Sequence, residues 1–217
     1  MTDTSKPVAL ITGASRGLGA ALAEALVPSH HVIAVARTIG GLEELDDRIK
    51  AKGGEATLAP MDIAKPEAMQ QLCRSIFDRW GGIALWVHTA NHAAPLAPAF
   101  MVNDKDWAKS VDINQTAAQR LIAYVTPLLG DKGTAIFFDD PIVKEKFSAS
   151  YGATKAAQIT LARAWAAETA RTGPRVLIHT PPPMPTALRA RFFPGESRDK
   201  ATDPAEVAQD VLKLLEN

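Results

Sequence analysis

Tyr151 and Lys155 are the residues whose types and spacing point most directly to chemistry. They lie four positions apart in the run SYGATKAA, which predicts a helix, and positions i and i+4 share one helix face. An ammonium group beside a phenol favours the phenolate and lowers the pKa of the phenol towards neutrality. The hydroxyl could then donate or accept a proton, so the pair is a candidate acid–base unit. A solvent-exposed helix face can carry the same spacing, so the prediction needs support from elsewhere in the chain.

A glycine-rich loop near the N-terminus gives that support. An apolar run at residues 8–11 predicts a buried strand, and TGASRGLG and a run of strong helix formers follow at once. Strand, glycine turn and helix form the context of a dinucleotide-binding fingerprint, in which Gly13 would permit the tight turn, Gly17 the approach of a pyrophosphate and Gly19 close helix packing. The helix N-terminus would bind phosphate. The spacing is G-x-x-x-G-x-G, and an ordinary loop of small residues is the alternative.

Two arginines favour NADP over NAD as the dinucleotide. A site for NAD usually has a carboxylate near the end of the second strand, but the strand expected at residues 31–36 is followed by Arg37, and no carboxylate appears before Glu43. Arg16 lies in the glycine loop. Guanidinium groups bind a phosphate in bidentate fashion, so the two side chains suit a ribose 2′-phosphate. Two solvated surface arginines are the alternative.

With both motifs in place, the chain resembles the short-chain dehydrogenase/reductase family over roughly residues 7 to 190. The resemblance implies that Tyr151 is the catalytic acid/base, that Lys155 assists it and binds the nicotinamide ribose, and that Asn114 supports a proton-relay water. Asp62 would contact the adenine and Thr186 the carboxamide. The expected cofactor-binding residues are Gly13, Ser15, Arg16, Gly17, Leu18, Gly19, Arg37, Asp62, Ile63, Ala90, Tyr151, Lys155 and Thr186.

Three positions depart from the pattern of the family. After the fourth strand the family reads Asn-Asn-Ala-Gly, whereas this chain reads HTAN at residues 88–91. Asn91 could replace the glycine if its φ is positive, because asparagine tolerates that region. Pro182 replaces the glycine of a Pro-Gly turn and removes a backbone donor. Asp140, with Asp139 as the neighbouring possibility, stands where the family has the serine that hydrogen-bonds the substrate oxygen.

An aspartate at that position conflicts with carbonyl reduction. Negative charge develops on the substrate oxygen as hydride arrives, so the site must supply hydrogen-bond donors, and an ionised carboxylate only accepts. It would also raise the pKa of Tyr151. Asp140 could escape the conflict by being protonated in an apolar pocket walled by Phe137 and Phe138, or by turning away to pair with Lys144 or Lys146. We therefore expect a slow or atypical reductase.

Apolar strands alternate with helices along the chain, which predicts an α/β fold of the Rossmann type with a doubly wound parallel sheet. The expected strands are 8–12, 31–36, 56–60, 83–88, 133–138 and 175–180, and the expected helices are 16–26, 42–52, 66–80, 104–129, 151–171 and 204–215. We expect six strands, without the seventh strand of the family. We expect one NADP-binding domain over residues 1–217, with a lid-like segment at about 184–199 that begins at a proline cluster. A rigid surface loop is the alternative for this segment.

Composition narrows the class of function. The chain has 217 residues, of which 47% are hydrophobic and 22% charged, and its 24 basic and 24 acidic residues balance, which argues against binding to nucleic acid or a membrane surface. No apolar run reaches the length of a membrane helix, and the start of the chain lacks the pattern of a signal peptide. The single cysteine, Cys73, fits a reducing cytoplasm, and no histidine has partners at metal-ligand spacing.

The leading hypothesis is an NADP-dependent oxidoreductase that reduces a carbonyl or oxidises a secondary alcohol of a small, mostly apolar substrate. The alternative is a dinucleotide-binding sensor or regulatory protein that has lost turnover because of Asp140. The missing strand favours a homodimer through helices 104–129 and 151–171, with a tetramer as the other possibility. Small residues such as Ala162, Ala166 and Ala170 would allow close helix packing, or would face the protein's own sheet.

Overall fold

The computed structural model describes residues 6–197 and 201–216. Six parallel strands form one sheet in the order β3-β2-β1-β4-β5-β6, which confirms the predicted fold class. The strands are β1 Val8–Thr12, β2 His31–Ala36, β3 Ala56–Pro60, β4 Leu85–His88, β5 Thr134–Phe138 and β6 Arg175–His179. Their bounds match the predictions to within two residues.

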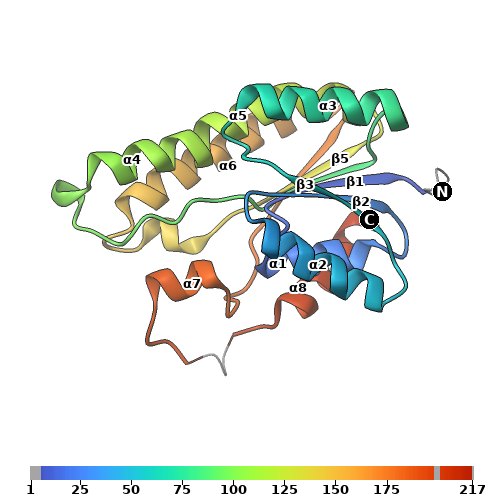
Figure 1. The fold of residues 1–217 in the computed structure, drawn as a ribbon. Helices are drawn as coiled ribbons and strands as arrows, with labels where there is room; N and C mark the ends of the chain where they lie inside the picture. The colour runs from blue at the N-terminus through green and yellow to red at the C-terminus, as the bar shows by residue number, and fades with distance from the viewer. Residues whose placement is uncertain (1–5, 198–200, 217) are drawn as a thin grey trace.

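Helices cover both faces of this sheet, as Figure 1 shows. Successive side chains of a strand point to opposite faces, so Leu10 joins the core under α3, α5 and α6, whereas Ile11 joins the core under α1, α2 and α8. Burial on both faces explains why the strands are almost continuously apolar. The α-helices are α1 Gly17–Leu26, α2 Ile39–Ala51, α3 Pro66–Trp80, α4 Asp104–Ser110, α5 Ala117–Leu129, α6 Ala149–Thr169, α7 Ala187–Phe192 and α8 Pro204–Glu216.

The predicted helix 104–129 is present as one continuous helical run, but its middle is not α-helical. A π-helical stretch, Val111–Thr116, lies between α4 and α5 and contains Asn114. Such a stretch has a wider turn and is often found at functional positions, and the pattern of apolar residues carries no signal for it. Two short 3₁₀ helices, Ala99–Met101 and Pro141–Lys144, were also not predicted.

The lid-like segment is partly helical, because α7 lies within it. Its last two residues, 198 and 199, lie outside the described residues. Of the small residues expected on this helix, Ala162 is buried in the core against the sheet, Ala166 is partly exposed, and Ala170, which follows the end of α6, is exposed. No helix among the described residues is long and apolar enough to span a membrane.

Candidate active site

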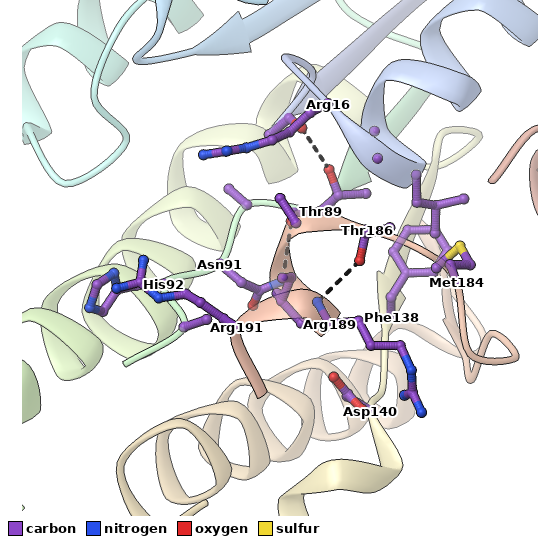
Figure 2. Close-up of a pocket in the computed structure, with 18 of the residues that line it drawn as sticks. Arg16, Thr89, Asn91, His92, Phe138, Asp140, Met184, Thr186, Arg189 and Arg191 are labelled. Carbon is purple, nitrogen blue, oxygen red and sulfur yellow. Dashed lines mark hydrogen bonds between the residues drawn. The ribbon is translucent and has the colours of Figure 1, made fainter. Parts of the chain in front are cut away.

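A cavity of about 700 Å³ opens at the carboxyl edge of the sheet, where an α/β fold of this kind binds its ligands. All the residues that the sequence predicted as cofactor-binding line it, and so does Asp140. Asn114 is the one predicted site residue that does not. The parallel register explains the convergence, because Thr12 pairs with Val35 and with His88 at the ends of three adjacent strands. Figure 2 shows side chains from this cavity, with Arg16 and Asp140 on opposite sides of the view.

The end of the cavity beside α1 presents backbone donors. Arg16 occupies the N-cap position of α1, makes no side-chain cap, and no acidic residue lies in the first turn. The first N–H groups of the helix are therefore not capped by a side chain, and they sit at the positive end of the helix dipole. Gly17 adopts a φ of +58°, which a side chain would strain, and Thr186 lies across from it.

The glycine loop also packs closely against its surroundings. A Cβ on Gly19 would come within 2.3 Å of the Gly13 carbonyl oxygen, and one on Gly13 within 2.6 Å of the Ala90 nitrogen. The Thr89 hydroxyl donates to the Thr12 carbonyl at 3.0 Å and lies 3.2 Å from that of Gly13. The loop after β1 is thus fixed to the loop after β4.

The two arginines expected at a 2′-phosphate both line the cavity and are exposed. Neither Arg16 nor Arg37 forms an ion pair within the described residues. Asp62 lines the same cavity and accepts a hydrogen bond from the Ala64 nitrogen at 3.0 Å. Its carboxylate is thereby held in place by its own loop.

At the other end of the cavity, Tyr151 contacts Asp140. The phenol donates to the Asp140 Oδ2 atom at 2.9 Å, and Asp140 Oδ1 accepts from the Ile142 nitrogen at 3.1 Å. Of the two alternatives given for Asp140, the one in which it turns away from Tyr151 towards Lys144 or Lys146 is therefore wrong. The neighbouring Asp139 also lines the cavity, but its carboxylate pairs with Arg163 at 3.1 Å and accepts from the Asp140 nitrogen at 2.8 Å. The position of the aspartate beside the tyrosine thus belongs to Asp140.

Of the two opposing effects expected on the Tyr151 pKa, the raising by Asp140 is present, and the lowering by Lys155 does not prevail. Burial raises the pKa of Tyr151 well above its usual value, and the charge of Asp140 and its hydrogen bond raise it further. Both effects favour the protonated phenol, because burial penalises the phenolate and a carboxylate repels it. The side chain is 2% exposed and packs on Phe192 of α7 with 5.0 Å between ring centroids.

Lys155 is held by two amides. It is 1% exposed, and its Nζ atom donates to Gln158 Oε1 at 2.6 Å and to Asn91 Oδ1 at 3.2 Å. Burial lowers the pKa of Lys155 to about 8, against the opposing charges of Asp140 and Asp139. An ammonium has three donors, so one remains after these contacts.

Gln158 continues this network into the sheet. Its Nε2 atom donates to the Asn114 carbonyl at 2.9 Å and lies 3.2 Å from His88 Nε2. An amide nitrogen only donates, so His88 accepts at Nε2 and carries its proton on Nδ1, which lies 2.8 Å from the Thr12 hydroxyl. Burial and the charge of Lys155 lower the pKa of His88 to about 3, and the ring is neutral.

Asn114 lies behind the cavity. Its side chain is fully buried, donates to the His92 carbonyl at 2.9 Å and to the Thr154 hydroxyl at 3.0 Å, and accepts from the His92 nitrogen at 2.6 Å. The amide thus fixes the loop after β4. The backbone carbonyl of Asn114 accepts from Gln158, which in turn accepts from Lys155, and this route connects Asn114 to the lysine.

Apolar side chains close the cavity around Tyr151. Ala93, Ile142 and Phe192 form a small buried cluster with it, and Phe138 lines the cavity as expected. Phe137 was expected in the same wall but is buried in the core between Trp86 and Trp165, because successive residues of a strand point to opposite faces.

Sequence reasoning missed three polar residues beside Lys155. Gln158 carried a signal, because it is three positions from Lys155 on the same helix face. His88 and Asn91 were noted only as departures from a motif. Asn91 was expected to need a positive φ, but the only described non-glycine residue with one is Phe147, at 69°. The Asn91 side chain binds Lys155 and the Thr89 carbonyl instead.

Comparison with known proteins identifies the family. The family model described as short chain dehydrogenase matches residues 7–197. The chain belongs to the short-chain dehydrogenase family. An uncharacterised oxidoreductase of Listeria monocytogenes is 31% identical over 182 residues, 81% of this chain and 72% of the relative. Another, from Staphylococcus aureus strain MW2, is 24% identical and covers 99% of this chain and 93% of the relative.

A solved structure gives the same result for this member of the short-chain dehydrogenases. A metagenomic short-chain oxidoreductase in complex with NADP is 25% identical, with a TM-score of 0.82 and coverage of 98% of this chain and 91% of that one. The resemblance inferred from the glycine loop and the Tyr-x-x-x-Lys pair is therefore confirmed at the level of the family.

Proposed function

We propose that the protein is an NADP-dependent oxidoreductase that reduces a carbonyl or oxidises a secondary alcohol of a small, mostly apolar substrate. The observation that carries the proposal is the continuous cavity of about 700 Å³, which joins the uncapped α1 N-terminus to Tyr151 and Lys155. One ligand can therefore contact the glycine loop and reach the acid–base pair. A cavity of this size is in the range of cofactor and ligand sites.

The residues present fit a dinucleotide phosphate. The N–H groups that begin α1 suit a pyrophosphate, the strained φ of Gly17 keeps its surface free of a side chain, and Arg16 and Arg37 suit a 2′-phosphate. Lys155 has one donor left for a ribose hydroxyl. When bound, the nicotinamide would supply or accept a hydride. NADP in the related metagenomic enzyme supports the choice of cofactor.

The protein's part in the reaction would be to supply the proton. Tyr151 is the acid that would protonate the substrate oxygen after hydride arrives at the neighbouring carbon, and Lys155 contributes positive charge nearby. To do so, the hydroxyl must leave its hydrogen bond to Asp140. The apolar cluster of Ala93, Ile142 and Phe192 excludes water from this end and thereby strengthens charge interactions inside it.

A sensor that binds the dinucleotide without turnover is the second candidate. The occupied hydroxyl of Tyr151 and its raised pKa favour it, because both oppose proton transfer. The two candidates differ only in hydride transfer and share the cofactor site.

Purified protein with NADPH separates them. Binding is measured by the fluorescence of the dihydronicotinamide, and turnover by its absorbance with a panel of ketones, aldehydes and secondary alcohols. We expect binding together with slow turnover that Tyr151→Phe abolishes. Binding without turnover across the panel would favour the sensor, and absence of binding would refute both.

Arg37→Ala tests the choice of cofactor. Because a guanidinium–phosphate contact is charge-assisted, we expect the affinity for NADPH to fall by about tenfold or more, with the affinity for NADH changed little. Arg171→Ala is the matched control, since it removes an exposed arginine outside the cavity. Equal losses for NADPH and NADH would refute the assignment of Arg37 to the 2′-phosphate.

A homodimer and a cytoplasmic location belong to this proposal as predictions of the sequence. Sedimentation of the purified protein tests the first.

A further inference from the structure

The Asp140 carboxylate is the most unusual chemical group of the cavity, because it presents acceptors where carbonyl reduction needs donors. It is half-buried and lines the cavity beside Tyr151. Each of its oxygens accepts one hydrogen bond, from Tyr151 and from the Ile142 nitrogen. A carboxylate offers about four lone-pair sites. Asp140 therefore keeps acceptor capacity at the end of the cavity that holds Tyr151 and Lys155, which we call the reaction end.

Cations near Asp140 have other partners. Arg189 binds both oxygens of Glu196, and the ammonium of Lys155 is held by Gln158 and Asn91. Within the described residues, no arginine, lysine or histidine forms a salt bridge with Asp140. The carboxylate is thus positioned beside the acid–base pair without a cation of its own.

We propose that this site reduces a protonated C=N bond, the iminium group of a small, mostly apolar imine, in preference to a carbonyl. The inference rests on the proposed function, since it uses the same cofactor site and names the class of substrate. The Asp140 carboxylate would accept the iminium N–H, and the apolar cluster around Tyr151 would hold the rest of the molecule.

The direction of the charge change decides between the two substrate classes. A carbonyl oxygen becomes negative as hydride arrives, so the nearby anion opposes the reaction, and the Tyr151 hydroxyl must also give up a charge-assisted hydrogen bond to help. An iminium group begins positive and brings its own N–H donor. The same carboxylate binds it and concentrates the reactive, protonated form of the imine.

The reaction balances without a proton from the protein. A hydride with its electron pair leaves the C–H bond of a dihydronicotinamide and forms a C–H bond at the iminium carbon. The π pair of the C=N bond becomes the lone pair of the amine. The substrate is reduced, the dihydronicotinamide is oxidised, and the positive charge moves from the first to the second. Tyr151 can therefore keep its hydrogen bond to Asp140 throughout.

Substrate preference is the first test. The ratio of kcat/KM for 3,4-dihydroisoquinoline to that for 1-tetralone, a ketone of similar shape, is measured at pH 7 with NADPH. We expect the imine to be preferred by wild type, and Asp140→Ser to shift the ratio towards the ketone by about 10- to 100-fold. Asp139→Asn removes the adjacent carboxylate, which pairs with Arg163, and should shift the ratio by less than about threefold. An unchanged ratio in Asp140→Ser overturns the inference.

A permanent cation separates charge from proton transfer. N-methyl-3,4-dihydroisoquinolinium needs no proton, so Tyr151→Phe should still reduce it while losing turnover of 1-tetralone. Loss of both would show that the hydroxyl is required for both classes and would overturn a reduction in which Tyr151 keeps its proton.

Binding gives a readout that does not depend on turnover. Calorimetry of the protein without cofactor should show that protonated 3,4-dihydroisoquinoline, which carries the iminium N–H, binds wild type at least about tenfold more tightly than Asp140→Ser, with 1-tetralone as the neutral control. If no variant oxidises NADPH with any probe, the proposed function fails, and this measurement still decides the inference. Binding that depends on Asp140 supports a cation site, and equal binding overturns it.

Discussion

The two ends of the cavity satisfy their polar groups in opposite ways. At the end beside α1, the backbone donors of the helix N-terminus have no side-chain cap, and Arg16 and Arg37 have no ion-pair partner among the described residues. At the other end, Tyr151 donates to Asp140, and Lys155 donates to Gln158 and Asn91.

The difference separates binding from chemistry. A set of open donors can bind an anion without first breaking internal contacts, because its reorganisation is already complete. A set of satisfied groups must exchange partners before it can act on a substrate, or must act on one that leaves those contacts intact. On the proposed function, the end with Tyr151 and Lys155 would therefore set the rate and the chemical class of the substrate, and the α1 end would set the cofactor.

The largest effect that we expect concerns the packing of the glycine loop at the α1 end of the cavity, which we call the open end. Gly19→Ala places a methyl group against the backbone oxygen of Gly13, which cannot move aside as a flexible side chain could. We expect a loss of about 3 to 5 kcal/mol in the free energy of unfolding, measured with urea. Gly40→Ala is the control, because that site in α2 is open and alanine is the better helix former. A stable Gly19→Ala variant would show that the loop tolerates a wider spacing.

Gln158→Leu removes the amide that hydrogen-bonds the buried polar groups of the reaction end. It takes an acceptor from the ammonium of Lys155 and leaves His88 Nε2 and the Asn114 carbonyl without their donor. We expect unfolding to become easier by about 2 to 4 kcal/mol and turnover to fall, with little change in NADPH affinity. Gln71→Leu on the exposed side of α3 is the control. If cofactor affinity falls as far as turnover, the two ends are not separable.

The smallest effect is a dependence of stability on pH. The pKa of Lys155 is lowered to about 8 from 10.5, so between these values the unfolded chain binds a proton that the folded chain has released. Raising the pH through this window therefore favours the folded state. Relative to Lys155→Met, wild type should gain about 1 to 3 kcal/mol between pH 8 and pH 10.5, measured by urea unfolding at each pH. The difference between the two proteins cancels Cys73, whose pKa is raised to about 11 by burial. Parallel stability profiles of wild type and Lys155→Met would mean that burial does not lower the pKa of Lys155.

Local patterns predicted the open end well, because its features are properties of short segments. A strand, a glycine turn and a helix N-terminus are adjacent in the chain, so TGASRGLG was enough to place the loop and its donors. The same holds for the six strands, whose continuous apolar character marks burial on both faces. The π-helical stretch around Asn114 escaped prediction because its widened turn leaves the apolar pattern almost unchanged.

The reaction end was predicted in its residues but not in its interactions. The sequence identified Tyr151, Lys155 and Asp140 and two opposing effects on the pKa of Tyr151, a lowering by Lys155 and a raising by Asp140. The spacing alone did not decide between them, whereas burial and the contact with Asp140 in the structure raise the pKa. Gln158 and His88 meet although 70 positions separate them, and spacing along the chain does not report such a contact.

The sequence by itself determined the family, the sheet and the glycine loop, because apolar periodicity and glycine conformations act over a few neighbouring residues. Only the tertiary structure decided that the hydroxyl of Tyr151 is bound to Asp140 and the ammonium of Lys155 to Gln158. Partners of buried polar groups depend on which segments the fold brings together, and their energies depend on how much water the surrounding side chains exclude.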